Sequence, residues 1–279
     1  MSSYNLNLLH NLQLINNVSS LKKYMETAST DNKNIIHEML LQSTDNKDNN
    51  NILSNKTILQ ELVNGNIIIN PFSLNNLAVG SYDVTLCSIY YRLRKPIDNT
   101  KILNIYSKSD IESKWELYKS QSVLEQAQLL KEWSFKWNGS DKDHIIWIDP
   151  NETLLCMTNE MIGGIKNITT KMFARSSMGR AGIQVCSCAG LGDVGYTNRW
   201  TLEIKNLNPY YKLPLLVDSR IAQIQFLRTD PLFDIDGYRS YTDQGKYQNN
   251  NHIDKEIDYT VMLPKLYKDK ELLKSNSII

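Results

Sequence analysis

The sequence is poor in cysteine and has no excess of charge of either sign. Its four cysteines among 279 residues include no Cys-x-x-Cys pair, which argues against a disulfide framework and favours a reducing compartment. Thirty-one Lys and Arg against 30 Asp and Glu give a net charge of +1, so the chain as a whole carries no electrostatic footprint for nucleic acid. Any phosphate-binding site must therefore be local.

Long apolar runs are also missing. No run approaches the roughly 18 to 20 residues of a membrane-spanning helix, and the first residues lack the charged start, apolar centre and cleavage site of a signal peptide. We therefore expect a soluble, intracellular protein of the cytoplasm (of the host, if the gene is viral), with no membrane or nucleic-acid partner. A hydrophobic content of 41% suffices for one main domain with added segments.

Composition divides the chain into three parts. Residues 1–55 carry apolar residues at helical spacing and then a polar linker, which predicts a helical N-terminal extension. Residues 56–232 form the main domain, and residues 233–279 form a C-terminal tail and extension. Within the main domain, residues 96–144 form an insertion that we expect to be helical, because Ile111, Trp115 and Tyr118 share one helical stripe.

Strand patterns dominate the main domain. In residues 81–93, Tyr82, Val84 and Leu86 alternate with more polar residues, as a half-buried strand requires. A helix with Asn55 as N-cap and Gly65 as C-terminal stop precedes this strand. Further short strands are expected at residues 144–148, 152–158, 182–188, 200–206, 212–217 and 220–227. This succession predicts a β-barrel or sandwich.

The string RSSMGRAG, residues 175–182, combines the groups that bind a polyphosphate. Serine hydroxyls, backbone N–H groups and guanidinium forks hold phosphate oxygens, and glycines let the backbone approach closely. A polar turn flanked by surface arginines is the alternative interpretation. The following segment, AGLGDVGYTNRWTLEIKN at residues 189–206, favours the phosphate site because it continues an ordered motif series.

This series resembles the dCTP deaminases of the homotrimeric dUTPase superfamily. The first motif of the family matches Arg-Ser-Ser-x-x-Arg at residues 175–180, and the next matches residues 189–206 at family spacing. The resemblance covers roughly residues 57–95 and 145–250. Three positions depart from the family pattern: Val84 replaces a leucine, Val194 replaces a proline, and Asn250 replaces the glutamine of the tail motif.

The resemblance implies a fold, an assembly and a set of ligands. The implied fold is mainly β, a distorted barrel of the dUTPase-like, β-clip type with added N-terminal and inserted helices. The implied assembly is a homotrimer with each active site between subunits. The implied reaction is zinc-independent hydrolytic deamination of dCTP to dUTP and ammonia, with Mg²⁺ carried in by the triphosphate and dTTP as an inhibitor.

A glutamate separates the deaminases from the dUTPases, which have an apolar residue at its position. Here the position is Glu203, and strand alternation places it on the face shared by Thr201 and Lys205. A solvent-exposed sheet face is the alternative interpretation of that alternation. By resemblance, Glu203 is the general base that activates a water, Ser176 and the Ala189 carbonyl assist, and Arg180 orients the carboxylate.

The resemblance also implies the nucleotide contacts. Asp193 would hold the deoxyribose 3′-hydroxyl, and Thr201 and Leu202 would read the base. The remaining expected contacts, to the phosphates or from the tail, are Arg175, Ser177, Met178, Gly179, Tyr238, Lys246 and Asn250.

The sequence also bears on other functions. The His-x-Glu and Pro-Cys-x-x-Cys signature of zinc deaminases is absent, and the four histidines are scattered, so no zinc and no protein-held metal is expected. The open alternatives are a dUTPase, a bifunctional enzyme that deaminates dCTP and also releases pyrophosphate, and a catalytically silent nucleotide-binding regulatory trimer.

Overall fold

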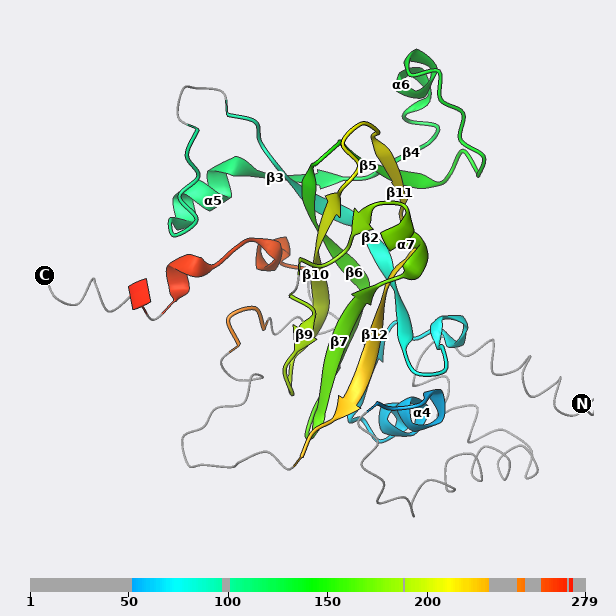
Figure 1. Cartoon of the computed structure of the whole chain (residues 1–279), viewed down its shortest axis with the longest axis vertical. Helices are drawn as coiled ribbons and strands as arrows, with labels where there is room; N and C mark the ends of the chain where they lie inside the picture. The colour runs from blue at the N-terminus through cyan, green and yellow to red at the C-terminus, as the bar shows by residue number, and fades with distance from the viewer. Residues whose placement is uncertain are drawn as a thin grey trace, which may run out of the picture.

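The structure is a computed structural model that describes residues 52–96, 101–187, 189–230, 245–248, 257–269 and 271–272. Antiparallel sheet is the main regular structure of the described chain (Figure 1). The helices predicted before residue 43 lie outside the described residues, as do Tyr238 and Asn250. No helix within the described ranges is long and apolar enough to cross a membrane.

The main sheet has nine strands in the order β8-β10-β6-β2-β12-β7-β9, and β1 pairs with β6 and β3 with β2 at its sides. The strands are β1 (Ile67–Asn70), β2 (Tyr82–Leu93), β3 (Trp115–Lys119), β6 (Thr153–Gly164), β7 (Ile168–Ala174), β8 (Ile183–Gln184), β9 (Leu191–Gly192), β10 (Thr197–Asn206) and β12 (Arg220–Arg228). A smaller sheet has the order β11-β5-β4, with β4 at Gln121–Ser122, β5 at His144–Ile148 and β11 at Leu213–Leu216.

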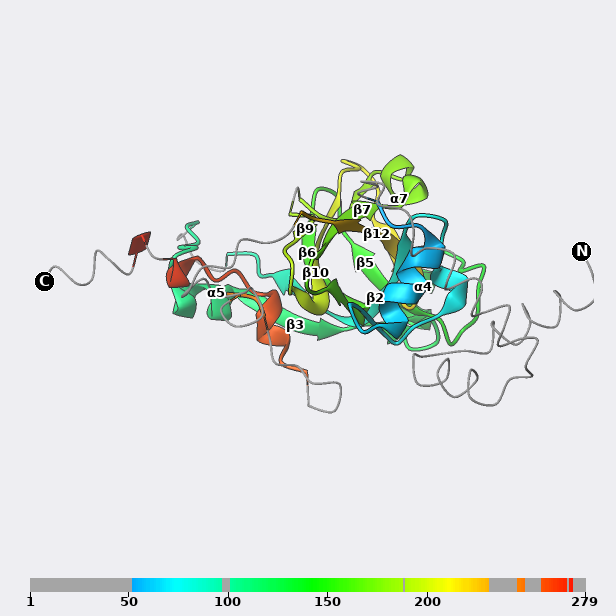
Figure 2. The same ribbon diagram turned by 90° about the horizontal axis from the view of Figure 1, so that it is seen from below.

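The main sheet curls so that its two ends meet. β9 closes one end of the strand order and β10 lies next to the other end, yet only residues 193–196 separate them in the sequence. A link this short forces the ends together, and the strands surround a common interior when the molecule is seen from below (Figure 2). The predicted mainly β class is therefore confirmed, and the meeting point of the two ends positions the candidate site.

The interior is filled by the apolar faces of the strands. Burial alternates residue by residue along β10, as the sequence predicted, and Leu202 and Ile204 are fully buried. Tyr82 and Phe226 are the largest fully buried side chains, and the phenol oxygen of Tyr82 accepts a hydrogen bond from the Ser73 N–H at 2.9 Å. That bond satisfies a polar atom that burial would otherwise leave unpaired.

Helix α4 (Asn55–Val63) leads into the sheet and begins one residue earlier than expected. Ser54, not Asn55, is its N-cap, because the Ser54 hydroxyl accepts from the Thr57 N–H at 3.4 Å. Gly65 follows the helix with φ of +75°, a conformation that glycine adopts without strain, so the predicted stop is confirmed.

The insertion contains less helix than the sequence predicted. Two short helices are present, α5 (Lys108–Lys114) and α6 (Ala127–Glu132), but residues 115–119 form strand β3. β3 pairs with β2 from Ile89↔Lys119 to Leu93↔Trp115. Hydrogen bonding to the edge of β2 therefore decided the conformation of residues 115–119, although Trp115 and Tyr118 have helical spacing in the sequence. The strand expected at residues 182–188 is likewise cut short: β8 ends at Gln184, where its two-residue pairing with β10 ends.

Deleting residues 1–50 is expected to leave this domain folded. The domain is held from residue 52 onward: Ile52 bridges to Leu227, and Leu53, buried, donates its N–H to the Phe226 carbonyl at 2.9 Å. The free energy of unfolding should therefore change by less than about 1 kcal/mol, as for changes away from a core. Urea unfolding followed by circular dichroism checks this. Extending the deletion through Leu53 is the control, and equal loss of structure in both variants would contradict the prediction.

Candidate active site

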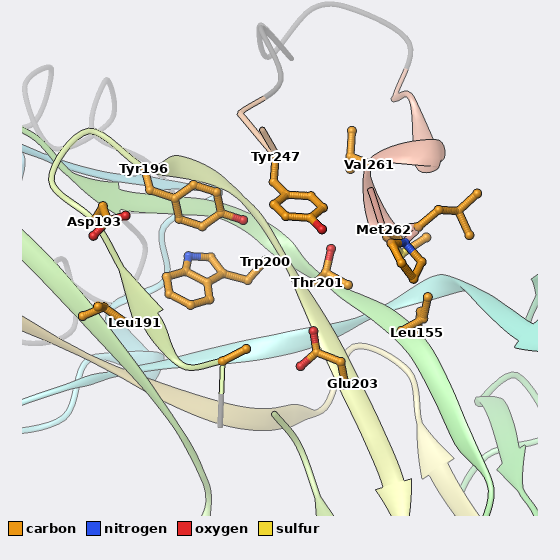
Figure 3. Close-up of a pocket in the computed structure, with 13 residues that line it drawn as sticks. Leu155, Leu191, Asp193, Tyr196, Trp200, Thr201, Glu203, Tyr247, Val261 and Met262 are labelled. Carbon is orange, nitrogen blue, oxygen red and sulfur yellow. The ribbon is translucent and has the colours of Figure 1, made fainter. Parts of the chain in front are cut away.

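A cavity of about 350 Å³ lies where the two ends of the curled sheet meet (Figure 3). Its acidic groups are Glu203 of β10 and Asp193 of the link between β9 and β10. Aromatic side chains form one wall and aliphatic side chains the other. The full lining is Leu155, Ala189, Leu191, Asp193, Tyr196, Trp200, Thr201, Glu203, Tyr247, Val261, Met262, Leu263 and Pro264.

Glu203 projects into this cavity beside Thr201 (Figure 3). Because residues two apart on a strand share a face, the alternation that buries Leu202 presents both polar side chains to the cavity. Glu203 Oε2 accepts a hydrogen bond from the Ser187 N–H at 3.3 Å. Burial raises the pKa of the Glu203 carboxyl above its ordinary value, and the Ser187 N–H acts in the opposite direction by favouring the ionised form.

Two glycines give the link before β10 its shape. Gly192 has no room for a side chain, because a Cβ there would overlap with Thr170 Oγ1 and with the indole of Trp200. Gly195 has φ of +93°, which a side chain would strain. The Tyr196 N–H donates to the Asp193 carbonyl at 2.9 Å, so the turn closes with Val194 in the usual place of proline. This turn holds the Asp193 side chain at the cavity.

The aromatic wall consists of Tyr196, Trp200 and Tyr247. The rings of Tyr196 and Trp200 meet edge to face, with centroids 5.1 Å apart and an interplanar angle of 78°. The Trp200 Nε1–H donates to the Ile162 carbonyl at 3.2 Å, which fixes the indole against β6. Such a wall offers flat apolar surface to a planar ring.

Residues 245–248 place Tyr247 over the cavity. The Asn198 side-chain amide donates to the Tyr247 carbonyl at 2.8 Å, and the Gln248 amide donates to the Thr197 carbonyl at 3.4 Å. Lys246, which the sequence assigned to phosphate, forms an ion pair with Asp269 and is not part of the cavity lining.

The structure does not bring the phosphate motif into this cavity. Ser176, Ser177, Met178, Gly179 and Arg180 form the short helix α7 (Ser176–Arg180) after β7, and none of them lines the cavity of its own chain. Figures 1 and 2 show α7 beyond the end of β7, away from β9 and β10.

Arg175 precedes that helix and also lies outside the cavity lining. Its Nε lies 3.6 Å from Oδ2 of the buried Asp83, and its Nη1 donates to the Arg220 carbonyl at 3.1 Å. The motif is thus anchored to β2 and β12 rather than placed beside Glu203.

Leu202 also departs from its expected role in part. Its side chain is fully buried in the core, so only its backbone could meet a base. Of the expected site residues, the single chain brings together Glu203, Ala189, Asp193 and Thr201.

Sequence reasoning missed Tyr196, Trp200, Tyr247 and the aliphatic wall. Tyr196 and Trp200 stand inside the matched motif, so position within the motif was an available signal. Leu155 and residues 261–264 carried no such signal, because their approach to the cavity depends on strand pairing and on the path of the C-terminal segment.

The fold and the cavity together define a mainly β protein with a largely apolar pocket that contains two carboxylates at the closing point of a curled sheet. The sequence model of the dCTP deaminase-like family matches residues 52–229. The chain belongs to the dCTP deaminase-like family, which confirms the resemblance found in its motifs.

Curated relatives agree with this assignment. The chain is 29% identical over 208 residues to a protein of Clostridium botulinum (strain Alaska E43 / Type E3) named dCTP deaminase, dUMP-forming, covering 75% of this chain and 96% of that one. It is 30% identical over 183 residues to a protein of the same name from Hydrogenobaculum sp. (strain Y04AAS1), covering 65% and 84%.

Among solved structures, the 2′-deoxycytidine 5′-triphosphate deaminase of Agrobacterium tumefaciens superposes with a TM-score of 0.45 at 16% identity. The superposition covers 65% of this chain and 49% of that one.

Proposed function

We propose that this protein deaminates dCTP by hydrolysis at C4 of the cytosine, with Glu203 as the base. The observation that carries the proposal is the placement of Glu203: a carboxylate with a raised pKa, in an apolar cavity, within a chain of the dCTP deaminase-like family. A carboxylate whose pKa lies closer to neutrality can both accept and return a proton during one reaction cycle.

In the proposed reaction Glu203 takes a proton from a water whose oxygen bonds to C4. The tetrahedral carbon then carries both the hydroxyl and the amino group. As the oxygen bonds to C4, the electron pair of the N3–C4 double bond moves to N3. Glu203 then returns its proton to the amino nitrogen, and ammonia leaves with the electron pair of the C4–N bond. The proton of the new hydroxyl passes to N3, and the oxygen becomes the C4 carbonyl of uracil. The cavity would hold the base between its aromatic and aliphatic walls, with Thr201 at the base edge and Asp193 at the sugar.

The phosphate motif would complete the site from a neighbouring subunit. Arg175, Ser176 and Arg180 lie outside the cavity of their own chain, yet their motif has the composition of a triphosphate cradle. In a closed trimer, the α7 segment of each chain would lie at the cavity of the next chain. This arrangement would explain why a phosphate-binding motif lies outside the cavity of its own chain. The homotrimer stays a prediction.

Metal enters this proposal only with the substrate. The part of the chain that the structure describes contains no group of three His, Cys, Asp or Glu side chains placed to hold an ion. In this proposal Mg²⁺ is bound through the phosphates of the nucleotide, as part of the substrate.

A second candidate function is deamination followed by hydrolysis to dUMP and pyrophosphate. It is favoured by the names of the relatives, since those from Clostridium botulinum and Hydrogenobaculum are called dUMP-forming. Asp193 lies in the same cavity as Glu203 and could serve the second hydrolysis without a separate site.

Product analysis distinguishes the candidates. We expect purified protein supplied with dCTP and Mg²⁺ to release one ammonia per dCTP consumed. Equal amounts of dUMP and pyrophosphate would support the second candidate, whereas accumulation of dUTP would support deamination alone. Pyrophosphate from dUTP with no ammonia from dCTP would contradict the proposal and identify a dUTPase, and nucleotide binding without either product would identify the silent regulatory trimer.

A further inference from the structure

Trp200 stands at an irregularity in the pairing of β10 with β6. The register of the two strands shifts at this residue, so that residues 158–160 of β6 lie opposite Trp200 alone. The Trp200 N–H donates to the Thr158 hydroxyl at 2.9 Å, and that hydroxyl donates to the Glu160 carbonyl at 2.7 Å. A bulge of this kind turns a side chain away from the regular pleat. This explains why Trp200 lines the cavity while Leu202, on the same buried face of β10, lies in the core.

The indole of Trp200 is held in one orientation. Trp200 is 4% exposed and packs in the main core, and its Nε1–H donates to the Ile162 carbonyl at 3.2 Å. Turning the ring would leave this buried N–H without a partner, which is costly. The indole is therefore a fixed surface for the segments that pack on it.

That surface contacts both ends of the link that carries Asp193. At the start of the link, Gly192 packs so closely that a Cβ there would lie 2.5 Å from Cζ2 and 2.8 Å from Cη2 of the Trp200 indole. At its end, the Tyr196 ring meets the indole edge to face, with centroids 5.1 Å apart. One side chain thus fixes the link on both sides of Asp193.

Backbone hydrogen bonds hold the link between these two contacts. The Thr169 hydroxyl donates to the Gly192 carbonyl at 2.7 Å, and the Gly195 N–H donates to the Gly164 carbonyl at 2.8 Å. The link is therefore short, closed and packed on a rigid ring, so a change in that ring must be passed on to the residues between its ends.

The Asp193 side chain depends on this support. Figure 3 shows Asp193, Tyr196 and Trp200 together at one side of the cavity, apart from Glu203. Within the described ranges of the chain, the Asp193 carboxylate has no hydrogen-bond or ion-pair partner. Its place is set by the link beneath it, and its oxygens are available to accept a hydrogen bond from a sugar hydroxyl.

We propose that Trp200 is a positioning residue for the sugar of the nucleotide: its indole sets the place of the Asp193 carboxylate, and through it the preference of the site for a nucleotide with a 3′-hydroxyl. The inference rests on the proposed function, in which Asp193 lies at the sugar. A hydrogen bond weakens steeply with poor distance and angle, so a displacement of the link by about 1 Å is enough to lose the contact.

The test measures kcat/KM for ammonia release from dCTP and from 2′,3′-dideoxy-CTP, which lacks the hydroxyl, with full-length protein. Trp200→Phe removes the part of the ring on which Gly192 packs, together with the indole N–H. Gly192→Ala leaves the indole in place and pushes the link away from it. Asp193→Ala is the reference variant, because it removes the carboxylate itself.

Trp147→Phe is the matched control. Trp147 also meets an aromatic ring edge to face, and its Nε1–H donates to the Gln126 side chain at 2.7 Å, but it lies in β5 and does not line the cavity. Its replacement removes the same chemical groups from the fold without touching the link. It should lower stability and leave the preference for dCTP unchanged.

In the unmodified protein, kcat/KM for dCTP should exceed that for 2′,3′-dideoxy-CTP by about 10- to 100-fold, the range for one hydrogen bond to a charged group. Asp193→Ala should abolish this preference. Trp200→Phe and Gly192→Ala should each reduce it on the order of tenfold, through a higher KM for dCTP and with little change for 2′,3′-dideoxy-CTP. The double variant should lose no more than either single variant, because both changes act on one contact.

An undiminished preference in Trp200→Phe and Gly192→Ala would overturn the proposal, and so would an unmodified protein that does not distinguish the two nucleotides. Slowing of both nucleotides by the same factor in Trp200→Phe would leave Trp200 a merely structural role. An equal loss of preference in Trp147→Phe would also overturn the proposal, because loosened packing alone would then suffice.

Should Trp200→Phe not fold, Gly192→Ala decides, since it moves the link while the tryptophan stays in the core. If the protein released no ammonia from dCTP, the proposed function would fail. Calorimetric titration with dCTP and 2′,3′-dideoxy-CTP would still decide on Trp200, because it measures the preference for the hydroxyl without turnover.

Discussion

Glu203→Gln should lower the rate of ammonia release from dCTP by about 10²–10⁴-fold, the contribution of a positioned general base. The amide keeps the size and hydrogen-bonding shape of the side chain but cannot take a proton from water. Because the cavity walls, Asp193 and Thr201 are unchanged, binding of dCTP should stay within about tenfold of the unmodified protein. Steady-state ammonia release and calorimetric titration with dCTP measure the two quantities separately.

Lys205→Gln is the matched control for this variant. Lys205 lies two residues further on β10, on the same face as Glu203, but it pairs with β8 and does not line the cavity. Its replacement should leave the rate unchanged. Turnover by Glu203→Gln above a tenth of the normal rate would remove Glu203 from the role of base.

Arg180→Ala should lower the rate by about 10²-fold, the effect of losing one preorganised polar group near the reacting atoms. This loss is expected even though Arg180 lies outside the cavity of its own chain, because the proposed site takes its phosphate motif from the next subunit. Assembling equal amounts of Arg180→Ala and Glu203→Gln chains should restore roughly a quarter of the normal rate. A working site then needs Glu203 from one chain and Arg180 from its neighbour, and each is present in half of the chains.

In the control for complementation, the Arg180→Ala chains are replaced by chains that carry both Arg180→Ala and Glu203→Gln. Mixed with Glu203→Gln chains, the double variant leaves no chain with an intact Glu203, so no activity should return. Sizing by light scattering follows the assembly in the same samples. Absence of complementation between the single variants, in a mixed trimer, would contradict the shared site.

The strand pattern of this protein is largely readable from its sequence. The alternation of Trp200, Leu202 and Ile204 in β10 follows from the twofold period of a strand with one buried face. The same period placed Glu203 toward the cavity. In β2 the predicted half-buried pattern is wrong, because Asp83 and Cys87 are buried as well as Tyr82, Val84 and Leu86. The helix stop at Gly65 was also predicted, because the positive φ after a helix is a local requirement.

Local patterns failed where distant parts of the chain compete for hydrogen bonds. Residues 115–119 have helical spacing, but they complete the ladder of β2. Residues 185–187 have strand-like alternation, but the pairing of β8 with β10 stops at Gln184 although β10 itself continues. In each case the deciding term is pairing with another segment, which no window of the sequence contains.

The sequence by itself determined the family, the mainly β class and the identity of the acidic residues, since these depend on residue types at short, fixed spacings. Only the tertiary structure decided what surrounds Glu203. Leu155 lies opposite the glutamate through strand register, and Met262 lines the same cavity because the C-terminal segment packs back on β6 and β2. The pKa of a carboxyl depends on every apolar atom and dipole near it, so its value is a property of the folded neighbourhood and not of the motif.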